Sequence, residues 1–400
     1  RVRNQTDQLY SAVSFMLMRE VNAVPRFVES FWDFAVREPN DVPQALRFHA
    51  LMARTPPRPP PPAGAPRPDI LVVLRESHVQ LPLLWGAVPP ADLPQPSAAR
   101  TEWQGKMGVH CVGGGTWLTE FAFLTGFCWS DFGNAGMYAP FTLAPRMKVA
   151  LPVQLRRLGY RTVAFYPVAG SFLNARMAYT GYGFDEFYSS EELGLSKDWH
   201  QLSDRTIFAA ALQRLRQQDD GRPVFAFILT IRNHGPHDRA VPNREASQPH
   251  DWPPQLRRSV ADYLDRQEET ELDFTWLREQ WLAAPAPRIL VGFGDHWPSL
   301  EGGTFWLADR PPVNLGIQRE LFQTPLSFVA NYVTPHLPQL RNLDAAFVGG
   351  TLLEFAGLEA GDFFSLNQWL RDHNAGLYRN AHDPHFVRGY LTWAHQSLGA

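Results

Sequence analysis

Cysteine is almost absent from this chain of 400 residues, which contains only Cys111 and Cys128. Two cysteines are too few for a multi-cysteine zinc module, so they are either free thiols or one disulfide bridge. A bridge would fit an oxidising compartment but would not prove one. The sequence leaves both alternatives open.

Long hydrophobic runs and long runs of like charge are also absent. No stretch reaches the roughly 18 to 20 apolar residues that a membrane-spanning helix requires, and no secretory signal opens the chain. Because the first residue is Arg1 rather than Met, we expect a signal or membrane region to precede it in the full-length protein. The 37 basic and 40 acidic side chains are dispersed and give a net charge of −3, which argues against nucleic-acid binding.

The composition allows one large domain, since 44% of the side chains are hydrophobic. Scattered apolar positions predict a helical connecting arm over residues 1–55. Prolines crowd residues 56–68, and their missing N–H groups and fixed φ angles predict an extended tether. The main domain is then expected over residues 69–400.

Continuous apolar runs of strand length alternate with helical patterns in the main domain. This alternation predicts an α/β fold with a mainly parallel central sheet and helices on both faces. Ligands of such sheets bind beyond the carboxyl ends of the strands. The expected strands are residues 69–74, 161–166, 223–230, 288–293 and 326–329, and the expected helices are 117–125, 149–158, 204–217 and 259–282.

Thr116 follows three glycines and begins a helical stretch. Glycines let the backbone approach a ligand closely, and a helix N-terminus offers N–H donors to a phosphate. A threonine hydroxyl is a poor nucleophile at neutral pH and needs a divalent cation to lower its pKa. Thr116 is therefore a candidate metal-assisted nucleophile, although a Gly-Gly-Gly-Thr segment can also be a plain helix start after a flexible loop.

Further polar residues follow the expected strands. Glu76 comes after the first strand, and Asp295 and His296 come after the strand at 288–293. Their oxygen and imidazole groups suit a divalent ion, although each could also be structural. His234 and His237 lie in an Asn-His-Gly-Pro-His segment after the strand at 223–230, which could also be a simple turn.

In this order, these clusters resemble the sulfatase-like phosphoglycerol and phosphoethanolamine transferases of the alkaline phosphatase superfamily, the group of lipoteichoic acid synthase and the osmoregulated periplasmic glucan phosphoglycerol transferases. The resemblance runs from about residue 68 to residue 356. Its seven motifs are PDILVVLRES at 68–77, GTWLTEF at 115–121, LGYRT at 158–162, YGFDEF at 182–187, NHGP at 233–236, GDHWP at 294–298 and TPL at 324–326.

The resemblance implies an alkaline phosphatase-like catalytic domain with a site for one divalent metal ion. Mn²⁺ is the expected ion, and Zn²⁺ or Mg²⁺ are the alternatives. It implies Thr116 as nucleophile and His234 as an acid–base group near the transferred phosphoryl group. The implied metal ligands are Glu76, Thr116, Asp295 and His296, and the implied substrate-binding residues are Trp117, Arg176, Asn233 and His237.

The implied reaction moves a phosphoglycerol head group from an anionic phospholipid, through a phosphothreonine, to a hydroxyl of a glycan acceptor. Phosphoethanolamine transfer is one alternative. Hydrolysis by a phosphatase, a phosphodiesterase or a sulfatase-like enzyme of the same superfamily is another. The implied location is periplasmic or otherwise extracytoplasmic, at the membrane surface through the missing N-terminal region.

Some positions depart from the family pattern. Ala175 stands where relatives often have an arginine, Tyr166 where they often have a histidine, and His237 where they often have a tyrosine. Neither cysteine lies in the Cys-x-Pro-x-Arg context that a true sulfatase needs, and a two-metal hydrolase would need further ligands. A domain that only binds a glycan or a partner protein is the non-enzymatic alternative.

Overall fold

The computed structural model describes residues 67–79, 100–300, 321–378 and 384–398, together with four isolated positions between 42 and 50. The expected arm over 1–55 lies outside the described residues apart from those isolated positions. The expected tether over 56–68 lies outside them apart from its last two residues. Among the described residues, no helix has both the length and the apolar character needed to cross a bilayer.

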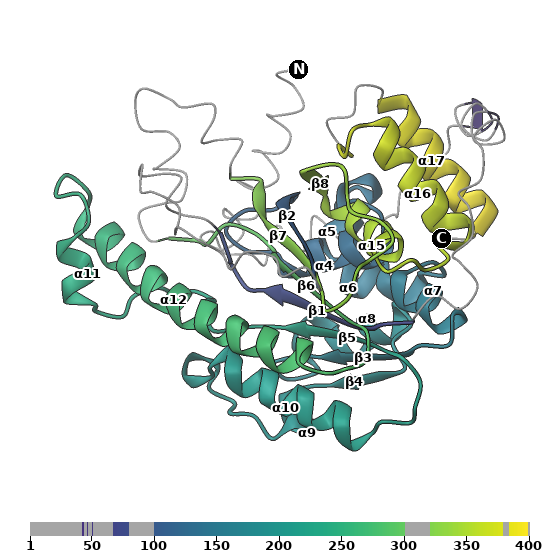
Figure 1. Cartoon of the computed structure of the whole chain (residues 1–400). Helices are drawn as coiled ribbons and strands as arrows, with labels where there is room; N and C mark the ends of the chain where they lie inside the picture. The colour runs from purple at the N-terminus through teal and green to yellow at the C-terminus, as the bar shows by residue number, and fades with distance from the viewer. Residues whose placement is uncertain are drawn as a thin grey trace.

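One eight-stranded sheet organises the described chain (Figure 1). Its strand order is β4-β3-β5-β1-β6-β7-β2-β8, and all neighbours run parallel except that β7 is antiparallel to both β6 and β2. The strands are β1 Asp69–Arg75, β2 Thr101–Gly108, β3 Arg161–Phe165, β4 Glu186–Tyr188, β5 Val224–Leu229, β6 Arg288–Gly294, β7 Gln323–Ala330 and β8 Asn342–Asp344.

The central strand β1 is buried on both faces, which explains its unbroken apolar sequence. Ile70, Val72 and Leu74 point into one hydrophobic cluster, whereas Leu71 and Val73 point into another. Alternate side chains of a strand point to opposite faces of the sheet, so each face needs its own cover of helices.

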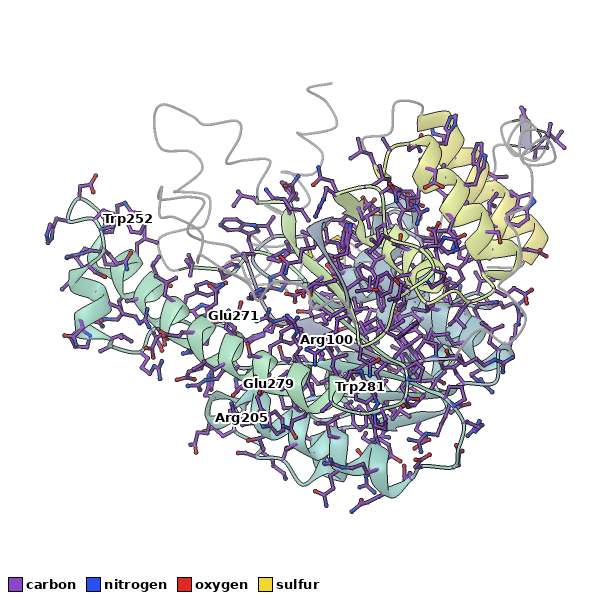
Figure 2. The ribbon with its side chains drawn as sticks, viewed as in Figure 1. Arg100, Arg205, Trp252, Glu271, Glu279 and Trp281 are labelled. Carbon is purple, nitrogen blue, oxygen red and sulfur yellow. The ribbon has the colours of Figure 1, made fainter. Side chains whose placement is uncertain are left out.

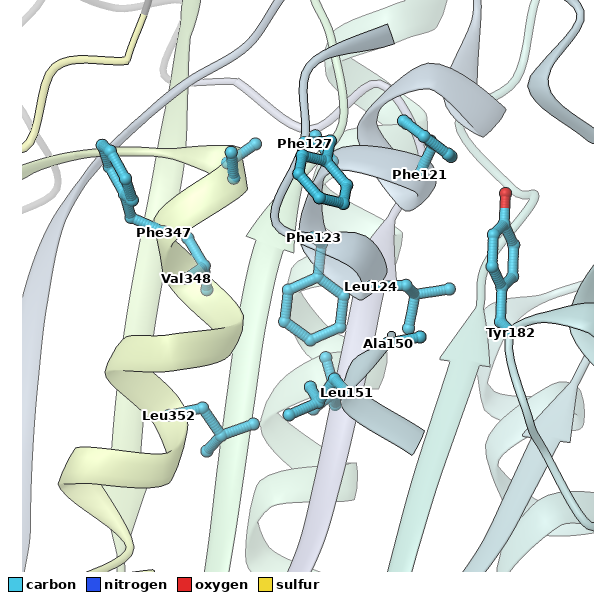
Figure 3. Packing of buried hydrophobic residues seen from close by; sticks show 14 of the residues in the cluster. Phe121, Phe123, Leu124, Phe127, Ala150, Leu151, Tyr182, Phe347, Val348 and Leu352 are labelled. Carbon is cyan, nitrogen blue, oxygen red and sulfur yellow. The ribbon is translucent and has the colours of Figure 1, made fainter. Parts of the chain in front are cut away.

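The first face is covered by helices whose side chains interdigitate in Figure 3. Phe123 is central among them, because its ring lies 5.7 Å from that of Phe227 on β5 and 5.0 Å from that of Phe293 on β6. This packing fixes the position, relative to the sheet, of the helix that begins at Thr116. The helices that contribute to this cluster are α4 Thr116–Thr125, α7 Leu151–Arg157, α8 Ala175–Gly181, α15 Ala345–Phe355, α16 Gly361–His373 and α17 Pro384–Leu398.

The opposite face is covered by α10 (Asp204–Gln217) and the C-terminal part of α12 (Pro254–Leu282). Trp281 anchors α12, since its indole N–H donates to the Ile289 carbonyl at 2.9 Å. The N-terminal part of α12 packs in a third hydrophobic cluster, where Val260 and Tyr263 meet Trp297. Trp252, just before the helix, lies far from Trp281 near its end (Figure 2). The remaining segments are short: η3 Trp129–Phe132, α5 Asn134–Met137, α6 Ala139–Thr142, η4 Ala144–Arg146, η5 Phe172–Asn174, α9 Ser190–Leu193, η6 Trp199–Gln201 and α11 Pro242–Ala246, where η marks a 3₁₀ helix.

The predicted fold class is confirmed, with a mostly parallel sheet between two layers of helices. The five expected strands correspond to β1, β3, β5, β6 and β7. The sequence pattern did not reveal β2, because half of its residues, TEWQGKMG, are polar and only two of the eight are buried. The strands β4 and β8 have three residues each and are too short to give a periodic signal.

Candidate active site

The sheet register brings the two acidic candidates together. Arg75, the last residue of β1, is the register partner of Gly294, the last residue of β6. Glu76 and Asp295 therefore directly follow two adjacent parallel strands at the same level. At Gly294 a Cβ atom would lie 2.0 Å from the His78 carbonyl oxygen, so only glycine fits where the strands meet. The carboxyl ends of β1 and β6 therefore place both carboxylates at one edge of the sheet.

A tight turn after β1 orients these carboxylates. Ser77 has a positive φ of 51°, and its backbone N–H donates to Asp295 Oδ1 at 2.7 Å. Its hydroxyl donates to Glu76 Oε1 at 2.8 Å, and the Glu76 backbone N–H donates to Thr230 Oγ1 at 2.9 Å. Glu76 is thus fixed in a buried position between β1 and β5.

His296 presents one specific nitrogen to the same place. Its Nδ1 lies 2.9 Å from the Trp297 carbonyl oxygen, which only accepts hydrogen bonds, so Nδ1 carries the hydrogen. The Nε2 lone pair is then available to a ligand. A carbonyl that orients an imidazole in this way is typical of metal-binding histidines.

Thr116 is the first residue of α4 and lies among these groups. Gly113, Gly114 and Gly115 precede it with positive φ angles of 75°, 145° and 92°, a path that residues with a Cβ rarely take. The Thr116 hydroxyl donates to Glu76 Oε2 at 3.2 Å and lies 3.3 Å from His296 Nε2. The glycine loop and the helix start thus bring the hydroxyl to the acidic edge of the sheet.

The buried charges fit a bound cation. Ligand atoms of Glu76, Asp295 and His296 lie within 4.8 Å of one another, and all three residues are buried. Within the described part of the chain, Asp295 Oδ2 has no hydrogen-bond partner, and it lies 3.2 Å from His296 Nε2. Two carboxylates buried side by side need a positive charge nearby. Their oxygens, together with imidazole, are suitable ligands for Mn²⁺, Zn²⁺ or Mg²⁺.

The protonation of the metal-free cluster reflects this crowding. Burial, and then the neighbouring Glu76 carboxylate, raise the pKa of Asp295 to about 7. Burial alone would lower the pKa of His296, but the carboxylates of Asp295 and Glu76 raise it overall. Without a cation, protons supply part of the missing positive charge.

A cavity with a volume of about 300 Å³ opens beside Thr116. Glu76, His234 and His296 also line it, so it gives a substrate access to the cluster. Among the described residues that line it, none is a lysine or arginine. Its aromatic wall consists of Trp117, Tyr166, Phe172, Tyr179, Tyr182 and Trp199.

Glu120 lies in the cavity wall one helical turn after Thr116. The Tyr179 hydroxyl donates to Glu120 Oε2 at 2.8 Å, and the buried Tyr182 hydroxyl has no hydrogen-bond partner among the described residues. Burial raises the pKa of Glu120 to about 8, so its carboxyl is mostly un-ionised at neutral pH. This part of the wall can hydrogen-bond to a hydroxyl group of a bound molecule.

His234 lines the cavity as an acid–base candidate. Its Nδ1 lies 2.6 Å from the Gly235 carbonyl oxygen, which again places the hydrogen on Nδ1. Its ring packs against Trp199, with the ring centroids 5.1 Å apart. Nε2 is the nitrogen left to exchange a proton with a substrate.

Of the four expected substrate-binding residues, the structure places only Trp117 in the cavity wall, where its indole N–H donates to the Met137 carbonyl at 2.8 Å. Arg176 instead pairs with Glu192 and lies over the Phe187 ring. The remaining two, Asn233 and His237, are buried outside the described cavity wall.

Asn233 and His237 form a support for the site. His237 Nε2 lies 3.0 Å from the Asn233 carbonyl oxygen and donates to it. The Asn233 side-chain amide lies 3.5 Å from the Ser77 carbonyl, which also accepts from the Tyr263 hydroxyl at 2.7 Å. Burial and the Arg266 guanidinium lower the pKa of His237 to about 4, so its ring is neutral. The contacts of Asn233 and Tyr263 with the Ser77 carbonyl hold the turn at Ser77 in place.

Several site residues were not identified from the sequence. The spacing of four between Thr116 and Glu120 could have indicated Glu120, because residues four apart share a helix face. Ser77 and Thr230 gave no such signal, since their roles depend on contacts between strands. The open question of a disulfide is answered, because Cys111 and Cys128 are both free and buried.

Comparison with known proteins agrees with this arrangement. The profile of the family described as Sulfatase matches residues 90–356, more than half of the chain. The chain belongs to this family. Its sequence is similar to a protein of Rhizobium meliloti whose name proposes a role in cyclic β-1,2-glucan modification, with 27% identity over 73% of this chain and 46% of the relative. The chain spans about half the length of the curated relatives it matches.

Solved structures of this sulfatase-like fold share the architecture. The phosphoglycerol transferase GacH of Streptococcus pyogenes, in complex with sn-glycerol-1-phosphate, superposes with a TM-score of 0.67 at 15% identity, over 91% of this chain and 95% of GacH. The periplasmic domain of EptC from Escherichia coli, in complex with zinc, gives a TM-score of 0.50 at 14% identity, over 75% of this chain and 87% of EptC. At these identities the likeness concerns the fold.

The raised pKa values give metal binding a defined pH dependence. In the metal-free protein, protonation of Asp295 contributes stability that is full below its ordinary pKa of 3.8 and is lost as the pH rises through about 7. His296 acts in the same direction. A bound ion replaces these protons, so adding Mn²⁺ should raise the melting temperature more at pH 8 than at pH 6, as measured by thermal unfolding.

The control for this prediction is Asp295→Asn, which keeps the shape of the side chain but removes the charged ligand. It should lose the metal-dependent rise at both pH values. An equal rise at pH 6 and pH 8 in the unaltered protein, or a full rise in the variant, would contradict the assignment of these residues to a metal site.

Proposed function

We propose that this chain is a metal-dependent phosphotransferase that moves a phosphoglycerol head group from an anionic phospholipid, through a phosphothreonine at Thr116, to a hydroxyl of a glycan. One observation supports this most strongly. The Thr116 hydroxyl lies 3.2 Å from Glu76 and 3.3 Å from His296, within a buried cluster that needs a cation and at the edge of a cavity.

The first half of the proposed reaction transfers the head group to the protein. Glu76, Asp295 and His296 would hold the ion, which when bound would supply the positive charge that lowers the pKa of the Thr116 hydroxyl and offsets charge on the phosphoryl group. The Thr116 oxygen, after its hydroxyl proton has passed to solvent, bonds to phosphorus, and the bond from phosphorus to the diacylglycerol oxygen breaks. His234, which at this stage carries a second proton on Nε2, donates that proton to the departing oxygen and becomes neutral. The backbone N–H groups at the start of α4 add hydrogen bonds to the phosphoryl oxygens.

The second half reverses these roles. A glycan hydroxyl loses its proton to His234, its oxygen bonds to phosphorus, and the bond from Thr116 to phosphorus breaks. Thr116 leaves without a proton and His234 again carries a proton on Nε2, so both groups are in the states from which the first half began. Since the cavity wall has no described lysine or arginine, the negative charge of the phosphoryl group would be balanced by the ion and by helix N–H groups.

The relatives support the substrate classes of this proposal. The GacH structure contains sn-glycerol-1-phosphate, and the Rhizobium relative is named for glucan modification. The un-ionised Glu120 carboxyl and the Tyr182 hydroxyl, which lacks a partner among the residues that the structure describes, also favour a ligand with hydroxyl groups. Phosphoethanolamine is the second candidate head group. We propose Mn²⁺ as the ion, with Zn²⁺ or Mg²⁺ as alternatives, and a periplasmic or otherwise extracytoplasmic location.

The other hydrolytic candidates have less support. Burial raises the pKa of the Cys111 thiol, and Thr116 takes the position next to the metal ligands, which argues against a sulfatase that uses a modified cysteine. A two-metal phosphatase needs a second set of ligands. Within the ranges that the structure describes, one group of three suitable ligands lies close enough to share an ion.

Covalent transfer to Thr116 can be tested with intact-mass spectrometry. Incubating the Mn²⁺-loaded protein with phosphatidylglycerol in the absence of acceptor should add the mass of one phosphoglycerol group. Thr116→Ala should abolish the adduct, whereas Thr116→Ser should retain some transfer because it keeps a hydroxyl. Thr180→Ala, which changes an exposed threonine on α8, is the matched control and should form the adduct normally. Transfer by Thr116→Ala would require another nucleophile.

The role of His234 predicts a separate effect. His234→Ala should lower turnover by about 10²- to 10⁴-fold, the usual range for a lost acid–base group, because Nε2 no longer exchanges the proton. Elemental analysis should still find one metal ion per chain. His250→Ala, which removes an exposed histidine, should leave turnover unchanged. Unchanged turnover in His234→Ala would exclude this role.

A further inference from the structure

Three large apolar side chains are exposed close to one another beside the cavity. Phe141, Phe172 and Met177 are 53%, 43% and 57% exposed. They lie on α6, η5 and α8, which pack against each other. The Asn174 side-chain amide joins two of these segments, because it donates to the Pro140 carbonyl at 2.9 Å. We call Phe141, Phe172 and Met177 the apolar rim.

The apolar rim is continuous with the cavity. Pro140 and Phe172 belong both to the segments that carry the rim and to the cavity wall. The Phe172 ring lies 6.0 Å from the ring of Trp199, which in turn packs against His234 at 5.1 Å. An unbroken path of aromatic side chains therefore leads from the exposed rim to the acid–base candidate.

The two segments that carry the apolar rim contain basic but no acidic residues. Residues 139–148 and 170–182 contain Arg146, Lys148 and Arg176 but no aspartate or glutamate, although the chain as a whole has a net charge of −3. Arg146 and Lys148 are exposed, and η4, which carries Arg146, packs against α8. Glu192 on α9 pairs with Arg176, and the exposed Glu191 beside it accepts from the Gly170 backbone N–H. Among the described residues, neither Arg146 nor Lys148 has an ion-pair partner, so these two supply the positive charge that is left for a ligand.

We propose that the apolar rim docks on the surface of an anionic phospholipid bilayer, with Arg146 and Lys148 against the lipid phosphates. Apolar side chains on short turns, flanked by basic residues, enter the boundary between head groups and acyl chains, while the basic residues bind anionic head groups. This docking proposal depends on the proposed function in one respect. A phospholipid donor keeps its acyl chains in the bilayer, so the mouth of the cavity has to face the membrane.

The binding test uses the Mn²⁺-loaded chain and sedimentation with vesicles. Vesicles of phosphatidylcholine with phosphatidylglycerol are compared with vesicles of phosphatidylcholine alone at one fixed salt concentration. The double variant Phe141→Ser/Met177→Ser should weaken binding by about tenfold or more, because less apolar surface leaves water. The double variant Arg146→Gln/Lys148→Gln should bind the anionic vesicles about fivefold more weakly for each charge removed, and its binding to phosphatidylcholine vesicles should not change. Phe172 is left unchanged because it lines the cavity.

The matched control is Leu272→Ser. Leu272 is 63% exposed on α12, the helix that covers the opposite face of the sheet, and its replacement should leave vesicle binding unchanged. Equal binding by the unaltered protein, the double variant and this control would overturn the proposal. So would self-association that depends on Phe141 and Met177 in a protein that does not bind vesicles, since the occupant would then be a second copy of the chain.

A second readout separates this surface from the proposed reaction. The double variant should lose head-group transfer from donor lipid in vesicles but keep transfer from a short-chain phosphatidylglycerol that is dissolved as monomers. Equal losses with both donors would contradict a docking role. If the unaltered protein transfers from neither donor, the proposed function fails, while vesicle sedimentation still decides whether the rim binds the bilayer.

Discussion

Two carboxylates buried side by side determine the chemistry of this protein. Glu76 and Asp295 meet because β1 and β6 are adjacent parallel strands in a fixed register, and a cation is the simplest way to stabilise both when ionised. His296 Nε2 and the Thr116 hydroxyl lie against the same pair. The sheet thus places two buried negative charges at its edge, and these charges favour a divalent cation there.

The hydrophobic core keeps the Thr116 hydroxyl, the proposed nucleophile, in place. Phe123 packs between α4 and the sheet, and Thr116 begins the same helix, so the position of the hydroxyl depends on core packing as well as on the glycine loop. On the other side, the turn at Ser77 is held by Asn233 and Tyr263. Preorganised groups of this kind stabilise charge without rearrangement during the reaction.

Sequence patterns predicted those parts of the site that depend on local structure. The apolar run before Glu76 and the glycines before Thr116 indicated a strand end and a helix start, and the structure has both. Contacts between distant segments left no pattern. Arg176 resembles a phosphate-binding residue in sequence, yet its ion pair with Glu192, sixteen residues later, directs it elsewhere. Similarly, the polar composition of β2 hid a strand whose place depends on pairing with β7 and β8.

The central claim is that the Thr116 hydroxyl shares one metal ion with Glu76, Asp295 and His296. Crystals grown with Mn²⁺ and measured at the manganese absorption edge would locate the ion by its anomalous scattering. The account predicts one peak per chain, with a Thr116 Oγ1, a carboxylate oxygen of each acidic residue and His296 Nε2 about 2.0–2.3 Å away. An ion bound by other residues, or one that leaves Thr116 out of its coordination sphere, would contradict it.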